Sequence, residues 1–226
     1  MQYNTILLDV DDTLLDFPAC ERAAFNRTMQ AVGVVPSDEL AAAYSVINTA
    51  LWKQFERGEI SRKAIFTTRY HRLAAQFGLS FPADMAAQLY PTFLSQQAIP
   101  LPGMREALHY LASRYRLYIA TNATISVQQP RLRSSGISAF VQDCFFSEQA
   151  GVQKPDEAFF HYCFARIPDF SPTATLMLGD SLTSDIRGAS NAGIDACWYN
   201  RTNTPRPAGL PIALEIHALS EIPQVL

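Results

Sequence analysis

Short, nearly continuous apolar runs recur along this chain, and each ends near a polar or glycine-containing turn. They lie within residues 3–10, 117–120, 144–146, 176–178 and 196–199. Unbroken apolar runs of this length are typical of central parallel strands, which are buried on both faces of a sheet. Helical patterns separate the runs, for example over residues 102–114, 156–166 and 183–192. Strands that alternate with helices predict an α/β fold with a parallel sheet.

Residues 17–99 carry a different pattern, because their apolar residues recur with helical spacing throughout. One such stripe consists of Leu40, Tyr44, Ile47, Leu51 and Phe55. Ser37 and Ser61 stand where helix N-caps are expected. A block of helices after the first predicted strand indicates a helical subdomain inserted into the sheet domain. We therefore expect one domain from residues 1–16 and 100–226, and a second from residues 17–99.

The composition excludes several classes of protein. Of 226 residues, 48% are hydrophobic and 17% charged, which is typical of a folded globular chain rather than a disordered one. The 18 Lys and Arg residues nearly balance the 21 Asp and Glu residues, and no block of like charge is present. An electrostatic footprint for nucleic acid or anionic lipid is therefore missing. No apolar stretch approaches the roughly 18 residues that span a bilayer, and the first residues do not resemble an export signal. We expect a cytoplasmic protein whose partners include neither nucleic acid nor a membrane.

Acidic residues follow two of the predicted strands. Asp9 and Asp11 lie at the end of the first strand, and Asp180 and Asp185 come after the fourth. Ligands of parallel α/β sheets collect at the carboxyl ends of the strands, so these four side chains are expected to share one crevice. Carboxylates gathered around one point suit a divalent cation. Taken singly, such acids are also common in turns and at helix starts.

Three further polar side chains fall at the same predicted edge. Thr121 and Asn122 follow the strand at 117–120, and Lys154 precedes a helix that begins near Asp156. Alone, Thr-Asn is ordinary turn chemistry, whereas a lysine ammonium can serve as a point charge for a phosphate. With the four aspartates, these residues supply a nucleophile, a second carboxylate, metal ligands, a hydroxyl and a cation. That set indicates phosphoryl transfer through an aspartyl-phosphate.

Four motifs in this order resemble those of the haloacid dehalogenase superfamily, in its phosphatase branch. In this chain they are D-x-D-x-T at Asp9, Asp11 and Thr13, then Thr121 with Asn122, Lys154 before Pro155, and Gly179-Asp180 followed by Asp185. The resemblance covers essentially the whole sequence. It implies a Rossmann-like core with a helical cap inserted between the first two motifs. It also implies Mg²⁺ as the cofactor.

The resemblance assigns a role to each matching position. Asp9 would attack phosphorus and become the aspartyl-phosphate, and Asp11 would protonate the leaving oxygen and then deprotonate the hydrolytic water. Thr121 would hydrogen-bond the transferred phosphoryl group, and Lys154 would balance charge and steady Asp9. The metal would be held by Asp9, by Asp11 through its backbone carbonyl, by Asp180, and by Asp185 directly or through water.

The substrate is expected to be a small phosphorylated metabolite. Residues 51–60 are similar to the corresponding cap segment of bacterial house-cleaning pyrimidine 5′-nucleotidases, which implies a nucleoside 5′-monophosphate, with a pyrimidine favoured. A nucleobase needs a flat partner, and Trp52, Phe55, Tyr44 or Phe17 could stack on it. The alternative is that these aromatic rings belong to the helical core. We expect Asn122, Phe17 and Trp52 to bind the substrate.

Other functions remain compatible with parts of this pattern. A sugar-phosphate phosphatase or a β-phosphoglucomutase-like phosphomutase would share all four motifs. A haloacid dehalogenase would have no use for the acid at Asp11, because a halide leaves without a proton. Residues 179–182 spell the signature of GDSL esterases, but the D-x-x-H that supplies their base does not occur. A phosphate sensor with a silent site would be expected to lose one of the motifs.

Overall fold

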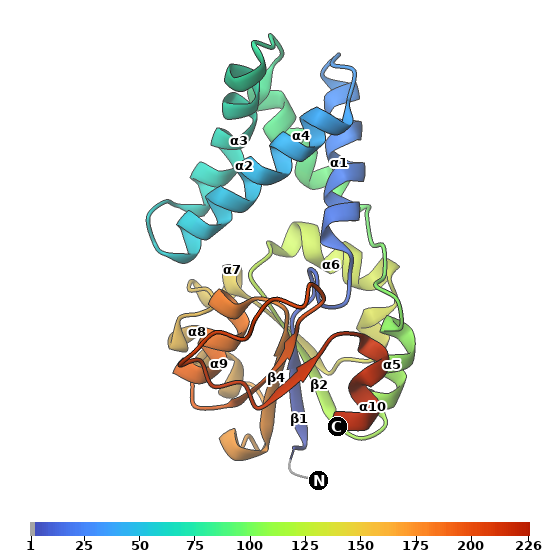
Figure 1. Cartoon of the computed structure of the whole chain (residues 1–226), viewed down its shortest axis with the longest axis vertical. Coiled ribbons are helices and arrows are strands. Elements are labelled where there is room, and N and C mark those ends of the chain that lie inside the picture. Colours follow the sequence, from blue (N-terminus) through green and yellow to red (C-terminus); the bar gives the residue numbers. More distant parts are fainter. Residues whose placement is uncertain (1–2) are drawn as a thin grey trace. The chain divides into compact units, whose positions relative to one another are not determined.

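Six parallel strands form one sheet in the order β3-β2-β1-β4-β5-β6. We describe them from a computed structural model, which covers residues 3–226 (Figure 1). The strands are β1 (Thr5–Leu8), β2 (Arg116–Thr121), β3 (Asp143–Phe146), β4 (Thr175–Gly179), β5 (Asp195–Tyr199) and β6 (Leu214–Ile216). Each predicted apolar run coincides with one of the first five. The α/β fold with a parallel sheet is confirmed.

The central strands are apolar because helices cover both faces of the sheet. Every residue of β1 and β4 is buried. Figure 1 shows α8 (Glu157–Phe164) and α9 (Arg187–Asn191) on one side, and α5 (Met104–Ala112) and α10 (Ile222–Val225) on the other. The short α7 (Ser147–Ala150) follows β3. An apolar cluster packs α8 and α9 against the sheet, and it includes Phe145, Phe159, Phe160, Met177 and Trp198.

The register of the sheet aligns the ends of its middle strands. Leu8 pairs with Ile119 on one side and with Leu178 on the other. The chain builds β2 and β3 on one side of β1, and then crosses to build β4, β5 and β6 on the other side. This reversal of strand order is a topological switch point, where open α/β sheets bind ligands beyond the carboxyl ends of their strands.

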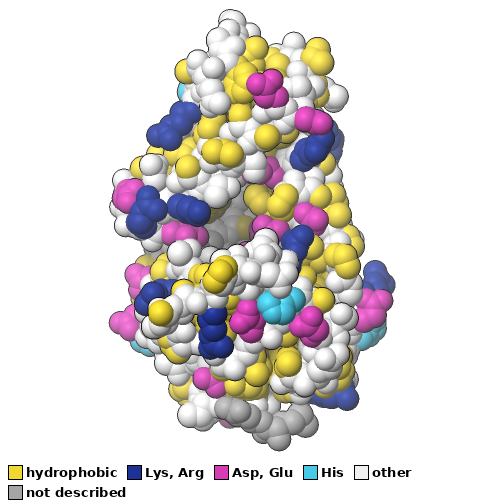
Figure 2. Space-filling view, viewed as in Figure 1, with side chains coloured by type: hydrophobic (Ala, Val, Ile, Leu, Met, Phe, Trp, Pro, Cys, Tyr) yellow, Lys and Arg dark blue, Asp and Glu magenta, His cyan; other side chains and the backbone are white. Residues whose placement is uncertain are grey.

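The chain divides into two compact units. The first contains the sheet and consists of the segment up to Asp16, Pro100–Ile125 and Leu132–Leu226. The second consists of Phe17–Ile99 and Ser126–Arg131, so it includes the middle of α6 (Ile125–Ser134). No helix among residues 3–226 has both the length and the apolarity needed to cross a membrane. On the face shown in Figure 2, basic and acidic side chains are interspersed.

The second unit, which we call the helical unit, is built from α1 (Phe17–Ala31), α2 (Asp38–Glu56), α3 (Arg62–Phe77) and α4 (Ala83–Ser95). Ser37 and Ser61 cap α2 and α3 by accepting hydrogen bonds from the amides of Leu40 and Ala64, so both predicted N-caps are confirmed. Apolar side chains from all four helices form its core.

Two residues of α6 belong to the helical unit through specific contacts. Val127 joins its apolar cluster. Arg131 is fully buried, and its Nε donates a hydrogen bond to the carbonyl of Gln97 at 2.8 Å. Its Nη1 donates to Gln128 Oε1 at 2.5 Å. The packing of Val127 and the bond from Arg131 to Gln97 explain why the middle of α6, which follows β2, groups with helices from an earlier part of the chain.

Candidate active site

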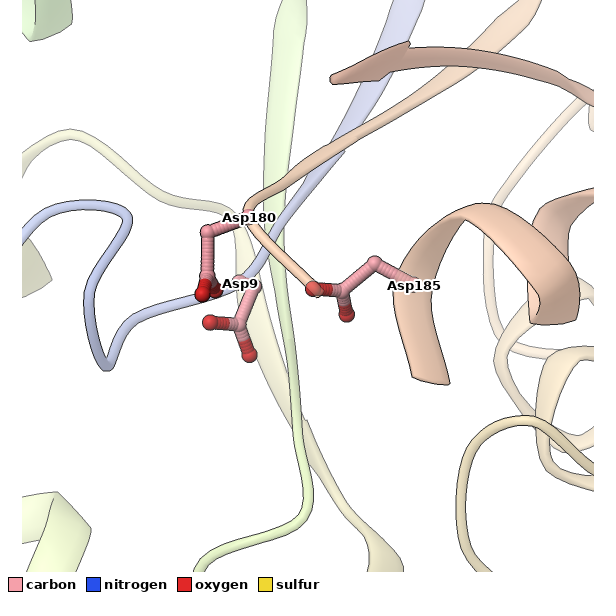
Figure 3. Close-up of side chains that lie close together, drawn as sticks. All are labelled: Asp9, Asp180 and Asp185. Carbon is pink, nitrogen blue, oxygen red and sulfur yellow. The ribbon is translucent and has the colours of Figure 1, made fainter. Parts of the chain in front are cut away.

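Three aspartates meet at the carboxyl edge of β1 and β4. Asp9 follows β1, and its amide continues the ladder by donating to the carbonyl of Leu178 at 3.0 Å. Asp180 follows β4, and Asp185 lies on the π-helix Leu182–Ile186. One oxygen from each carboxylate lies within 4.8 Å of the others, and Figure 3 shows the three side chains converging.

Lys154 lies at the centre of this cluster and is 1% exposed. Its Nζ donates to Asp9 Oδ1 at 2.7 Å, to Asp185 Oδ1 at 2.6 Å and to the carbonyl of Ala120 at 2.7 Å. An ammonium has three hydrogens to donate, so these three acceptors fix its position. Burial alone would lower the pKa of Lys154, but the two carboxylates outweigh that effect and hold the pKa above its ordinary value. The lysine is therefore a permanent cation.

One ammonium does not neutralise three carboxylates, two of them buried and that of Asp180 partly exposed. Burial raises the pKa of Asp9 to about 7, even though Lys154 opposes the shift. Burial, followed by repulsion from Asp185 and Asp9, holds the pKa of Asp180 well above its ordinary value. A second cation would relieve this excess of negative charge. Closely spaced carboxylate oxygens are the ligands that a hard divalent ion such as Mg²⁺ prefers, so the donor set fits that ion.

Thr13 links the two aspartates whose pKa is raised. Its hydroxyl oxygen lies 3.2 Å from Asp9 Oδ2 and 3.4 Å from Asp180 Oδ1. The residue is fully buried within the tight loop after β1, where the amides of Thr13, Leu14 and Leu15 all donate to the carbonyl of Val10. The threonine of the first motif thus lies beside both acids, and its single hydroxyl hydrogen can be donated to either one.

Asp185 is held by backbone as well as by lysine. Its Oδ2 accepts a hydrogen bond from the amide of Ser181 at 3.1 Å, while its Oδ1 accepts from Lys154. The Ser181 carbonyl accepts from the amide of Asp185, as in an α-helix, and also from the amide of Ile186, which is five residues on and gives the winding of a π-helix. The predicted helix over 183–192 is accordingly π-wound in its first part and becomes α9 at Arg187.

Ser181 itself acts as a helix cap. Its Oγ accepts a hydrogen bond from the amide of Ser184 at 3.2 Å and lies 3.2 Å from Thr183 Oγ1. These are the contacts of an N-cap, whereas an esterase nucleophile would be paired with a histidine base. The geometry therefore does not favour the GDSL interpretation.

Asn122 clamps the lysine segment. Its amide nitrogen donates to the carbonyl of Lys154 at 3.0 Å, and its Oδ1 accepts from the amide of Lys154 at 2.9 Å. Thr121 is buried at the end of β2, where its Oγ1 accepts from the amide of Ala123 at 3.2 Å. The second motif therefore orients Lys154 through Asn122. A substrate contact by Asn122 stays a prediction.

Asp11 and Asp12 lie in the loop between Asp9 and α1. Asp11 is partly exposed and close enough to Asp9 to help raise its pKa. Asp12 adopts a left-handed backbone conformation (φ 62°), and Arg201 donates to its carboxylate at 3.2 Å. The predicted role of Asp11 as general acid and base is compatible with this position and stays a prediction.

The two aromatic residues expected to bind the substrate belong to the helical unit. Phe17 is the first residue of α1, and Trp52 lies on α2. Both are partly buried against the apolar cluster, and the Trp52 ring meets the rings of Phe55 and Phe66 edge-on, at centroid distances of 5.7 and 6.4 Å. Part of the surface of each ring is covered by packing within the helical unit. Stacking of either ring on a nucleobase stays a prediction.

Sequence reasoning missed several contributors because their role depends on backbone atoms. The carbonyl of Ala120 accepts from Lys154, and the amide of Ser181 donates to Asp185. The side chains of Ala120 and Ser181 do not indicate either contact. The sequence pattern places Trp198 in a strand and predicts no contact for its indole nitrogen, which donates to the carbonyl of Asp180 at 2.9 Å.

A parallel α/β sheet with a helical insertion after its first strand, and a buried lysine among aspartates at its switch point, is the arrangement expected of a haloacid dehalogenase-like enzyme. The model of the haloacid dehalogenase-like hydrolase family matches residues 3–193. The chain belongs to this family, so it is an enzyme, and the predicted resemblance is confirmed.

Several relatives support this assignment along the whole chain. The HAD-hydrolase YfnB of Bacillus subtilis is 37% identical over 225 residues, which cover 100% of this chain and 96% of YfnB. Pyrimidine 5′-nucleotidase PynA of Streptococcus pneumoniae is 41% identical over 201 residues, 88% of this chain and 85% of PynA. Pyrimidine 5′-nucleotidase YjjG of Escherichia coli is 26% identical over 226 residues, 100% of this chain and 99% of YjjG.

A crystal structure of YfnB, described as bound to magnesium and as revealing interdomain movement, superposes with a TM-score of 0.95. The match covers 100% of this chain and 99% of that one. The fold of this enzyme is therefore that of a haloacid dehalogenase-like hydrolase throughout.

Proposed function

We propose that the enzyme is a Mg²⁺-dependent phosphomonoester hydrolase that works through an aspartyl-phosphate on Asp9. The observation that carries this proposal is the contact of Asp9 with Lys154 inside a cluster of three carboxylates, of which those of Asp9 and Asp185 are buried and that of Asp180 is partly exposed. The lysine keeps one oxygen of Asp9 in place and favours its ionised form, as a nucleophile requires. The excess negative charge of the cluster favours the binding of a divalent cation by these carboxylates.

Asp9, Asp180 and Asp185, with the backbone carbonyl of Asp11, are the residues that would hold Mg²⁺. When bound, the ion would supply positive charge that offsets the repulsion between the carboxylates and a phosphate dianion. One oxygen from each of the three carboxylates lies within 4.8 Å of the others, which suits this role.

The chemistry of the protein's own residues divides into two half-reactions. In the first, an Asp9 oxygen bonds to phosphorus, the bond to the leaving oxygen breaks, and Asp11 gives its proton to that oxygen. In the second, ionised Asp11 takes a proton from water, the water oxygen bonds to phosphorus, and the bond to Asp9 breaks to release phosphate. Thr121 would donate its hydroxyl hydrogen to the phosphoryl group.

Nucleoside 5′-monophosphates are the substrates that we favour, with pyrimidines preferred. The names of PynA and YjjG support this choice, as does the presence of Trp52 and Phe17 in the helical unit. These substrates are cytoplasmic metabolites, which agrees with the predicted location. A sugar phosphate remains the second candidate, because the phosphate chemistry at Asp9 would be the same.

A substrate panel tests the proposal directly. Purified enzyme, stripped of metal and then assayed with and without Mg²⁺, should release phosphate from uridine and thymidine monophosphates faster than from hexose phosphates or phosphoglycolate. The Asp9→Asn variant serves as the matched control, because it keeps the side-chain volume. Full activity without Mg²⁺ would contradict the metal assignment. Isomerisation of a hexose 1-phosphate would instead identify a phosphomutase.

A further inference from the structure

We infer that Trp198 is a positioning residue for the metal-binding aspartates. Trp198 lies on β5, is buried, and reaches across to the end of β4, where its Nε1 donates to the carbonyl of Asp180 at 2.9 Å. The hydrogen bond is made to the backbone carbonyl of Asp180 and not to its carboxylate. Its effect on the site therefore runs through the backbone.

The carbonyl of Asp180 lies where the sheet stops supplying hydrogen-bond donors. The pairing of β4 with β5 ends at Gly179 and Trp198, and the next residues of the β4 chain turn into the π-helix. A buried carbonyl at such a point needs a donor from elsewhere. The indole N–H supplies it from a side chain that is otherwise part of the apolar cluster packed under α8 and α9.

This contact fixes one peptide unit at both ends. The carbonyl of Asp180 and the amide N–H of Ser181 belong to the same planar peptide group. Trp198 holds the carbonyl, and Asp185 Oδ2 accepts from the N–H at 3.1 Å. Rotation of this peptide would break both hydrogen bonds together.

The held peptide restrains the backbone next to both carboxylates. It limits ψ of Asp180 and φ of Ser181, and so restrains the backbone that carries the Asp180 carboxylate, which lies 3.4 Å from Thr13 Oγ1. It also places the N–H that holds Asp185 against Lys154. Supporting groups of this kind around a metal site commonly account for about 10-fold to 100-fold in metal affinity.

This inference rests on the proposed Mg²⁺ site, and the test separates the two. Mg²⁺ binding to metal-free protein is measured by titration calorimetry for the wild type, for Trp198→Phe and for a control, Ile212→Ala. Ile212 belongs to the same apolar cluster as Trp198, so its truncation loosens packing without removing the indole N–H. We expect Trp198→Phe to weaken Mg²⁺ binding about 10-fold, and Ile212→Ala to leave it within about twofold.

Each other outcome overturns a defined claim. Equal Mg²⁺ affinity in the wild type and Trp198→Phe would refute the positioning role and leave the proposed function standing. Equal weakening in both variants would show general loosening and would also refute it. If the wild type does not bind Mg²⁺, both proposals fail.

A substitution at one atom covers the case in which Trp198→Phe does not fold. The chain has two tryptophans, Trp52 and Trp198, so in a Trp52→Phe background β-(3-benzothienyl)alanine can replace Trp198 alone. This analogue keeps the shape of indole and has sulfur in place of N–H. The same loss of Mg²⁺ affinity, measured against Trp52→Phe with natural tryptophan, would support the inference, and unchanged affinity would refute it.

Discussion

The carboxylate of Asp185 occupies the space that a side chain on residue 179 would need. A Cβ added to Gly179 would lie 2.3 Å from Asp185 Oδ2, which is far inside van der Waals contact. Only glycine at this position lets Asp185 approach the end of β4 and meet Lys154. The glycine of the fourth motif is thus explained by the room it leaves, since its φ is not in the left-handed region.

Gly179→Ala should therefore damage catalysis more than folding. The new methyl group displaces Asp185, and Lys154 loses one of its three acceptors, so we expect kcat/KM for p-nitrophenyl phosphate to fall about 100-fold. Gly188→Ala is the matched control, because its Cβ would meet the ring of Phe160 rather than a carboxylate. It should lower the Tm and affect kcat/KM less. Wild-type kcat/KM in Gly179→Ala would show that Asp185 can move without consequence.

Asp9→Asn should abolish turnover, because an amide cannot form the acyl phosphate. Asp11→Asn should lower kcat by about 10²-fold to 10⁴-fold on uridine monophosphate, the usual contribution of a general acid or base. The loss should shrink on p-nitrophenyl phosphate, since p-nitrophenolate leaves without a proton. Steady-state kinetics on both substrates measure the difference, and equal losses would exclude Asp11 as the acid.

The stabilisation of the protein by Mg²⁺ should increase with pH. In the metal-free enzyme, burial raises the pKa of Asp9 from 3.8 to about 7, so the folded state holds this proton more tightly than the unfolded chain. The contribution of Asp9 to stability is therefore present at low pH and is lost as the pH rises toward 7. Mg²⁺ needs ionised carboxylates, so the Tm shift on adding Mg²⁺ should grow from about pH 5.5 to about pH 8.

Thermal melts at several pH values, with and without Mg²⁺, check this expectation. Asp195→Asn is the control, because Asp195 accepts a hydrogen bond from Tyr3 and lies at the start of β5, whereas the cluster follows the ends of β1 and β4. The Tm shift that Mg²⁺ causes in Asp195→Asn should change with pH as it does in the wild type. A shift that is independent of pH would contradict the role of Asp9 as a metal ligand.

Substitutions of Asn122 should separate positioning from substrate binding. Asn122→Ala removes two hydrogen bonds to the backbone of Lys154, and we expect kcat to fall about 10-fold to 100-fold, by analogy with other supporting groups. Asn122→Asp should be at least as harmful, because a carboxylate oxygen would face the Lys154 carbonyl. If Asn122 acts through Lys154, kcat falls equally for nucleotides and for p-nitrophenyl phosphate. A rise in KM confined to nucleotides would favour direct contact with the substrate.

Trp52→Ala should raise KM for uridine monophosphate if the ring stacks on the base. Stacking contributes roughly 1–3 kcal/mol per base elsewhere, which corresponds to about 5-fold to 150-fold in KM, while KM for p-nitrophenyl phosphate should be unchanged. Phe66→Ala is the control, because Phe66 packs against Trp52 and reports loss of packing alone. Equal damage on both substrates would assign Trp52 to the helical core.

The strands could be predicted because a strand that is buried on both faces of the sheet must be apolar along its length. The grouping of the acidic motifs could be predicted because the carboxyl ends of parallel strands lie at the same edge of the sheet. The clamp between Asn122 and Lys154 could not, since it joins a side chain to backbone atoms 32 residues away. The contact of Trp198 with the Asp180 carbonyl could not be predicted either, because it also joins a side chain to a backbone atom. The π-wound start of the 183–192 helix also lacked a signal, because it arises when two amides share the Ser181 carbonyl.

The division of α6 between two units constrains how related enzymes can be recombined. Val127 packs in the apolar cluster of the helical unit and Arg131 bonds to the carbonyl of Gln97, although both follow β2 in the chain. A chimera that exchanges only residues 17–99 would set these two side chains against a foreign surface. A graft that transfers the helical unit intact must therefore be bipartite, with residues 126–131 carried along as a second fragment.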